Sequence, residues 1–130
     1  MHLRNMSVGG LLALALIAGC HSKNTPPPTA QDIEAAKQDA QREIAQARAE
    51  ASKDIKSAEK VSGSGKSVAR AKAEGAYDIA MVKADGDHTV ATEKCLTLEV
   101  SLQQPCKQQA DADYESAKAA AKATRVAREQ

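Results

Sequence analysis

Three cysteines carry the most definite chemistry in this 130-residue chain: Cys20, Cys95 and Cys106. A cysteine sulfur can be acylated, oxidised to a disulfide or deprotonated to bind a metal, and its surroundings decide which. Cys20 ends an apolar segment near the N-terminus, whereas Cys95 and Cys106 lie in a polar, alanine-rich part of the chain. The two settings predict two different fates for the sulfur.

The segment before Cys20 has the composition of an export signal. Met1–Asn5 carries one positive charge, at Arg4, and Met6–Ala18 is an almost uninterrupted apolar run of 13 residues. Such a run matches the hydrophobic region of a signal peptide and is too short to span a bilayer comfortably. We therefore expect residues 1–19 to be a signal peptide.

The end of the stretch Leu11–Cys20 (LLALALIAGC) is more specific. Ile17–Cys20 places an aliphatic residue and two small residues before the cysteine, which resembles the lipobox of bacterial lipoproteins. In that family the cysteine sulfur is diacylated, the preceding peptide is removed and the new N-terminus is acylated. The resemblance implies a lipid anchor at Cys20. Because His21 follows instead of the aspartate that retains such proteins in the inner membrane, it also implies the Gram-negative outer membrane, facing the periplasm. The alternative is an ordinary secretory signal with a cysteine near its cleavage site.

Export also bears on Cys95 and Cys106. Exported proteins fold in an oxidising compartment, where an even number of cysteines favours disulfides. With Cys20 assigned to the lipid, the other two cysteines remain as a pair. We therefore expect a disulfide between Cys95 and Cys106.

Two short motifs resemble ligand-binding sites. Residues 63–67 (GSGKS) match the end of a phosphate-binding P-loop, but Lys60 stands where that motif requires glycine and no strand precedes it. Residues 85–88 (DGDH) combine two carboxylates with a single histidine, without the spacing of an EF-hand. We interpret the first as a flexible joint and the second as an exposed turn or helix start. We assign no catalytic, cofactor-binding or metal-binding residue, and expect no enzyme activity.

Composition limits the fold. Apolar residues make up 42% of the chain, but alanine dominates them, Phe and Trp are absent, and the aromatic residues are Tyr77 and Tyr114. A compact core would bury too little area to offset the entropy of ordering the chain. We expect an all-α protein of long alanine-rich helices, partly coiled-coil-like, with a flexible N-terminus. The formal net charge of +1 argues against a nucleic-acid ligand.

The lipidated cysteine and a proline-rich tether occupy residues 20–29. Serial prolines favour extended geometry, so residues 21–29 reach up to about 28 Å. Thr29 then offers an N-cap, with Asp32 three residues later as in a capping box. These signals predict a helix over residues 30–61.

An eleven-residue repeat runs along this first helix. It steps 3-4-4, so the apolar stripe stays on one face with a slight right-handed drift. Because the stripe consists mostly of methyl groups, it suits close approach of another helix more than a thick core. Its members are Ile33, Ala36, Ala40, Ile44, Ala47, Ala51, Ile55 and Ala58.

Residues 62–67 are expected to form a Gly/Ser hinge that uncouples this helix from a disulfide-stapled hairpin over 68–130. After the hinge the 3-4-4 step resumes, with Gly75 and Gly86 in place of alanine. Each glycine lowers helix propensity by about 1 kcal/mol but removes side-chain bulk from the stripe. We expect a kink near Gly86. The resumed stripe comprises Val68, Ala71, Gly75, Ile79, Val82, Gly86 and Val90.

Within the hairpin, the first helix should end at about Leu98 and turn at Glu99–Val100. Ser101 can cap the second helix, Leu102–Arg128, with Pro105 in its first turn. If the bonded cysteines face each other, facing residues have numbers that sum to 201. This register pairs Tyr77 with Thr124, Met81 with Ala120, Ala84 with Ala117, His88 with Asp113 and Ala91 with Ala110.

Part of the hairpin carries a family pattern. The matching residues are Tyr77, Cys95, Leu98, Cys106, Ala110, Tyr114, Ala117, Lys118 and Ala121. They resemble alanine- and lysine-rich exported proteins of proteobacteria with a Cys-x10-Cys helical hairpin. The chain departs from that pattern at Leu96, where the family often has Asp, and at Glu99–Val100, where it usually has Ser-Gly. The resemblance implies a hairpin and no particular reaction.

Cys20 and the alanine-rich helix also resemble the murein lipoprotein group, whose chains end in a lysine linked to peptidoglycan. This chain ends in Glu129-Gln130, so covalent attachment is not implied. We predict a lipid-anchored envelope protein with a structural or interaction role. Its membrane contact is the lipid, and the partners left open are an envelope protein, non-covalently bound peptidoglycan and a second copy of the chain. The alternative is a stress- or desiccation-protective helical protein that folds on membranes.

Overall fold

The computed structural model describes residues 26–62 and 65–129, which contain three helices. These are α1 (Ala30–Ser62), α2 (Gly65–Leu96) and α3 (Val100–Glu129). The described residues include no strand, which confirms the predicted all-α fold class. The predicted signal peptide and Cys20 lie outside the described residues.

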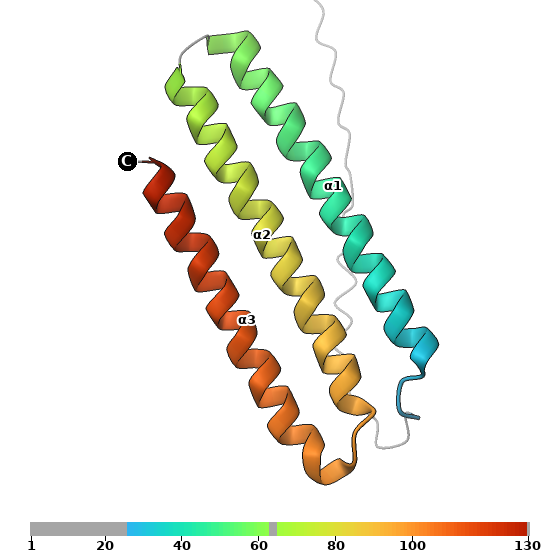
Figure 1. Cartoon of the computed structure of the whole chain (residues 1–130). Coiled ribbons are helices and arrows are strands. Elements are labelled where there is room, and N and C mark those ends of the chain that lie inside the picture. The colour runs from blue at the N-terminus through green and yellow to red at the C-terminus, as the bar shows by residue number, and fades with distance from the viewer. Residues whose placement is uncertain (1–25, 63–64, 130) are drawn as a thin grey trace, which may run out of the picture.

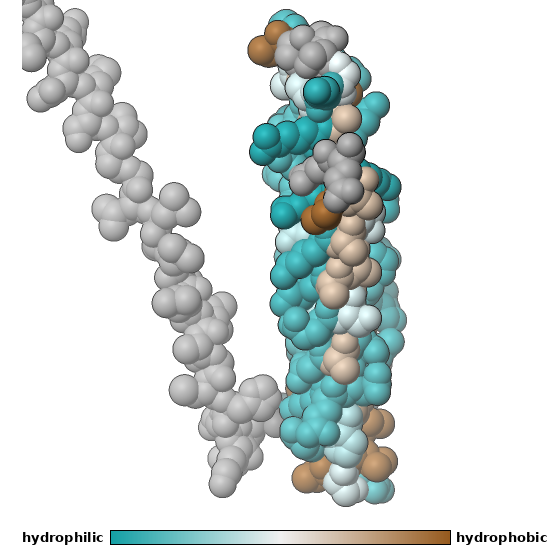
Figure 2. Space-filling view, turned by 90° about the vertical axis from the view of Figure 1, so that its left-hand side faces the viewer, coloured by the Kyte–Doolittle hydropathy of each residue, from teal (hydrophilic) through white to brown (hydrophobic). Residues whose placement is uncertain are grey.

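The helices lie side by side in a single layer, with α2 in the middle and antiparallel to both neighbours (Figure 1). α2 packs on α1 along one side and on α3 along the other, whereas α1 and α3 make no contact in the described parts of the chain. Viewed from the α3 edge, the layer is a narrow column (Figure 2). Its buried apolar residues are small ones: Ala47, Ala51, Ala73, Ala84, Cys95, Ala110 and Ala121.

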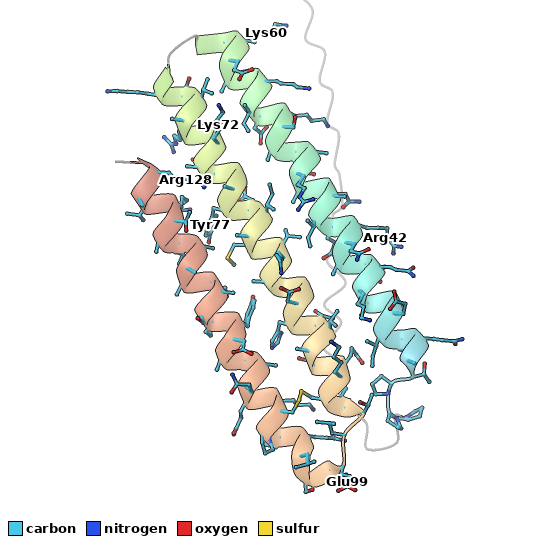
Figure 3. All side chains as sticks on the ribbon, in the orientation of Figure 1. Arg42, Lys60, Lys72, Tyr77, Glu99 and Arg128 are labelled. Atoms are coloured by element: carbon cyan, nitrogen blue, oxygen red, sulfur yellow. A yellow bond between two sulfur atoms is a disulfide. The ribbon has the colours of Figure 1, made fainter. Side chains whose placement is uncertain are left out.

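The flat shape follows from the sequence of α2. Gly75 and Gly86 contact α1, whereas Cys95 bonds to α3 and Tyr77 lies between α2 and α3 (Figure 3). At 3.6 residues per turn, these two sets of positions lie about 180° apart around the helix. A central helix with opposite contact stripes cannot bring both neighbours together, so a closed three-helix bundle does not form.

α1 begins at the predicted cap. The Thr29 backbone N–H donates to Asp32 Oδ2 at 2.7 Å, and the Asp32 N–H donates to Thr29 Oγ1 at 3.3 Å. This is a reciprocal capping box with aspartate in the acidic position. The Thr29 backbone N–H, and then its hydroxyl, hold the pKa of Asp32 below its ordinary value. The stabilisation is therefore present above the ordinary carboxyl pKa and is lost as pH falls through the lowered value.

The two 3-4-4 stripes form the α1–α2 seam. A Cβ atom built on Gly75 would lie 2.6 Å from the Ala51 Cβ, and one built on Gly86 would lie 2.6 Å from the Ala40 Cβ. Residue numbers sum to 126 in both pairs, so one antiparallel register holds along the seam. The helices can approach this closely only because the four facing positions carry no side chain beyond a methyl group.

This seam overturns three sequence predictions. α1 packs on α2, so the two helices are not uncoupled, and Lys66 and Ser67, placed in the hinge, lie in α2. Residues 85–88 are also helical and do not form a turn or a helix start. α2 runs straight in Figure 1, so the predicted kink near Gly86 is not seen. Packing against Ala40 outweighs the low helix propensity of glycine.

The α2–α3 turn lies two residues earlier in the chain than predicted. α2 ends at Leu96, and the Glu99 carbonyl accepts the first bonds of α3, so the predicted Ser101 cap is wrong. Pro105 lies inside α3, past its first turn. The turn is closed by Gln103, whose Nε2 donates to the Leu96 carbonyl at 3.3 Å and to the Leu98 carbonyl at 2.9 Å. A side chain of α3 thus satisfies carbonyl groups at the end of α2.

We expect Gly86→Ala to destabilise the protein. Helix propensity alone would favour alanine, but the added methyl would collide with Ala40, and overpacking of this kind costs about 1–3 kcal/mol. The measurement is urea unfolding followed by circular dichroism. The control is Gly65→Ala, where nothing lies within 4 Å of the added Cβ, so no loss is expected. If the urea midpoint of unfolding of Gly86→Ala is as high as that of Gly65→Ala, the close approach of α1 and α2 is refuted.

Candidate functional site

The structure joins Cys95 of α2 to Cys106 of α3. Their Sγ atoms are 1.96 Å apart and their Cα atoms 5.5 Å apart, a separation typical of disulfides. Cys95 is 1% exposed and is the largest fully buried side chain among the described residues. Cys95 is the last residue but one of α2, so the bond ties α2 to α3 close to the turn that connects them.

A polar cluster joins the same two helices farther along. His88 Nε2 lies 2.7 Å from Asp111 Oδ1, and the His88 ring stacks on Tyr114 with ring centroids 4.8 Å apart. The Tyr114 hydroxyl donates to Asp85 Oδ1. The predicted turn motif of residues 85–88 therefore supplies two of the four members of this cluster, Asp85 and His88.

Two cations lie over the two tyrosine rings. Lys118 Nζ is 4.6 Å from the Tyr114 ring centroid, and the Arg125 guanidinium is 4.5 Å from that of Tyr77. Both distances are within the range of cation–π attraction. Lys118 also pairs with Glu115 at 2.8 Å, and this hydrogen bond raises the pKa of Lys118. The aromatic residues of the chain thus contribute to the α2–α3 seam as platforms for charged groups.

The register of the hairpin is close to the predicted one, but the partner of His88 differs. The numbers of paired residues lie at or near 201: Cys95 meets Cys106, His88 meets Tyr114 and Tyr77 meets Arg125. His88 pairs with Asp111, not with the predicted Asp113. Asp113 instead accepts a hydrogen bond from Gln109 at 2.8 Å, within α3.

The geometry of the cluster suits a cross-link between helices. Its two carboxylates are each occupied, Asp85 by the Tyr114 hydroxyl and Asp111 by His88. Asp111 is 68% exposed, so the pairs contribute modestly to stability and act mainly by fixing the register. Within residues 26–62 and 65–129, no group of three or more His, Cys, Asp or Glu residues is placed to hold a metal ion.

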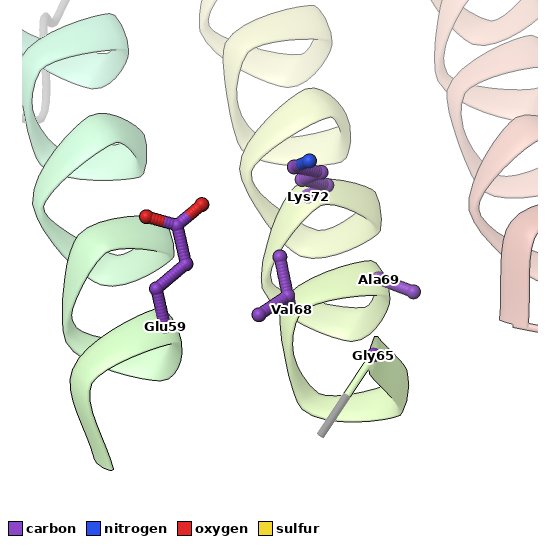
Figure 4. Close-up of a pocket in the computed structure, with 5 residues that line it drawn as sticks. All are labelled: Glu59, Gly65, Val68, Ala69 and Lys72. Carbon is purple, nitrogen blue, oxygen red and sulfur yellow. The ribbon is translucent and has the colours of Figure 1, made fainter. Parts of the chain in front are cut away.

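Residues 65–67 of the sequence that resembles a P-loop lie at the start of α2. Gly65 and Lys66 lie in its first turn, beside a surface hollow between the ends of α1 and α2. Glu59 of α1 and Lys72 of α2 lie on either side of this hollow (Figure 4). The Gly65 backbone has open space around it and makes no cradle. The described part of this motif therefore lacks the strand-loop-helix arrangement of a phosphate site.

Sequence reasoning missed the Tyr114–Asp85 bond and the role of Gln103. The predicted register contained a signal for the first, because it sets position 114 opposite position 87, between Asp85 and His88. Gln103 gave no comparable signal, since its role depends on where α2 ends.

Removing the disulfide with Cys95→Ser and Cys106→Ser should lower the free energy of unfolding by about 3 kcal/mol in the chain-entropy model. Because α1 packs on α2, we expect the loss across the whole layer, detected as a lower melting temperature. Thiol labelling of denatured, non-reduced protein provides the direct measurement. Recovery of Cys95 and Cys106 as free thiols in protein purified without reductant would refute the bond.

The pKa of Tyr114 should lie above the ordinary tyrosine value. The hydrogen bond to Asp85, and then desolvation, raise its pKa. The contribution of this hydrogen bond to folding stability is therefore present below the ordinary tyrosine pKa, and it is lost as the pH rises through the raised pKa. In a Tyr77→Phe background, ultraviolet absorbance reports Tyr114 alone. Asp85→Ala should lower the pH midpoint of Tyr114 ionisation. Asp113→Ala is the control and should leave this midpoint unchanged. Equal midpoints for the Asp85 and Asp113 variants would show that the bond is absent in solution.

Comparisons with known proteins identify no family for this chain. The chain matches no protein-family model, no curated protein and no solved structure.

Proposed function

We propose that this protein is a lipid-anchored lipoprotein of the outer membrane, facing the periplasm, with a structural or interaction role. The observation that carries the proposal is the sequence Ile17–Cys20, IAGC, at the end of an apolar run that follows Arg4. Its resemblance to a lipobox assigns the anchor to Cys20 and the removed peptide to residues 1–19. None of the described helices is long and apolar enough to cross a membrane.

The helical layer is compatible with this anchoring. α1 begins at Ala30, ten residues after Cys20, and Pro26–Pro28 precede it outside any helix. α1 contains 33 residues, so the layer is about 50 Å long. A protein held at its N-terminus in this way would present both faces of the layer to the periplasm.

The surface of the layer favours an interaction role. The described residues include no buried polar or charged side chain, and their ion pairs lie mostly on exposed helix flanks. We propose that these flanks contact an envelope protein, peptidoglycan without a covalent link, or another copy of the chain. We propose neither a catalytic residue nor a cofactor.

The stress-protective alternative requires a chain that is disordered in dilute solution. The single register of the α1–α2 seam and the side-chain cross-links between α2 and α3 favour a specific folded state instead. We therefore place the envelope role first. We propose a relationship to the alanine- and lysine-rich exported proteins of proteobacteria, on the basis of the residues of the hairpin that resemble them.

Cys20→Ser should abolish lipidation, because no sulfur remains to be acylated. We expect loss of palmitate labelling together with an unprocessed precursor or release from the membrane. The double variant Cys95→Ser with Cys106→Ser is the matched control and should stay labelled. A Cys20→Ser protein that is still acylated and matures normally would refute the anchor. If the protein fractionates with inner-membrane markers on a sucrose gradient, only the outer-membrane assignment is refuted.

A further inference from the structure

The end of the layer that carries the α2–α3 turn exposes three aliphatic side chains. Leu98 is 41%, Val100 84% and Leu102 53% exposed. We call these three residues the apolar end. They account for three of the five large hydrophobic residues exposed in the described chain. Hydrophobic atoms gather at this end of the column in Figure 2.

The turn itself does not need these side chains. Gln103 closes it through the carbonyl groups of Leu96 and Leu98, and the Glu99 carbonyl receives the first α3 bonds. Polar residues would serve an exposed turn equally well. A protein with few large apolar residues therefore exposes three of them together at a place where the fold does not require them.

The described chain begins beside this surface, at Pro26. Pro26–Pro28 line the same groove as Leu98 and Val100, so the chain enters the described structure at the apolar end. Five residues separate Cys20 from Pro26. Fully extended, that connection spans at most about 20 Å. The opposite end of the layer, with Val61, lies one helix length farther away.

We propose that the apolar end rests on the lipid bilayer beside the anchor, with Leu98, Val100 and Leu102 at the boundary between headgroups and acyl chains. This inference rests on the proposed anchoring at Cys20. Glu99 is exposed between two of these residues, and a carboxylate resists transfer into hydrocarbon, so the contact stays at the interface. Three side chains are far fewer than the 20–30 residues per partner of a standard protein interface, which disfavours a second copy as the occupant.

Tryptophan fluorescence tests this contact, since the chain contains no Trp. Val100→Trp places an indole at the apolar end, and Val61→Trp is the matched control, because Val61 is 85% exposed at the opposite end. Each protein is purified with its lipid and reconstituted in phosphatidylcholine vesicles with or without brominated acyl chains. An interfacial side chain lies roughly 5–10 Å deep, so we expect bromine to quench the Val100→Trp emission about twofold and leave Val61→Trp unchanged.

Hydrogen exchange of the unsubstituted protein provides a second measurement. Amides of residues 97–103 should exchange more slowly when the protein is bound to vesicles than when the same chain has been released from the vesicles into detergent-free solution. The exchange of amides near Val61 should be the same in both states. Equal quenching of the two Trp variants, with no protection of residues 97–103, overturns the contact. A Val100→Trp emission that shifts with protein concentration in the absence of vesicles would assign the apolar end to a second copy and also overturn it.

Failure of the anchor is distinguishable from failure of the contact. The mass of the N-terminal peptide shows whether Cys20 carries acyl chains. If it does and Val100→Trp is not quenched, the anchor stands and the contact is wrong. If Cys20 is unmodified, the proposed function fails, and the same variants coupled through the Cys20 thiol to a maleimide lipid still test the contact.

Discussion

The close approach of α1 and α2 is the constraint on which the rest of the layer depends. At two places, eleven residues apart on each helix, a glycine of α2 lies against an alanine of α1 with no room for a further methyl group. Dispersion attraction between two backbones replaces the large side chains that the sequence lacks. The eleven-residue period keeps each stripe on one face of its helix for more than twenty residues, so the contact repeats along the seam.

The same period leaves the opposite side of α2 available for a different kind of seam. Toward α3 the contacts include a disulfide, a stacked His–Tyr pair and the cation–π contact of Arg125 with Tyr77. One seam thus depends on the absence of side chains, the other on specific pairs. This division explains why α2 has little amphipathicity of its own, whereas α1 and α3 each have one apolar face.

Much of this arrangement could be predicted from the sequence. The isoleucines at 33, 44 and 55 and the resumed stripe from Val68 predicted the long helices, and the spacing of Cys95 and Cys106 predicted a hairpin in nearly the observed register. Residues 85–88 were misjudged because local propensity disfavours glycine and aspartate in a helix, while the contact with Ala40 is a tertiary effect. The side of α2 on which α1 packs could not be read from either helix alone. The choice of Glu99 over Ser101 at the start of α3 likewise depends on Gln103 reaching across the turn.

The absence of contact between α1 and α3 in the described chain makes the protein a nearest-neighbour array, as in a short repeat protein. In the described residues, the contacts between helices join only helices that are adjacent in sequence, so the helices can assemble by successive hairpin closures. The array also has two free edges. α1 can separate from α2 while the stapled α2–α3 pair keeps all of its own contacts, which makes α1 the first cooperative unit to open. An opened α1 would expose the Gly75 and Gly86 stripe of α2 to any alanine-rich helix that presents the same eleven-residue spacing.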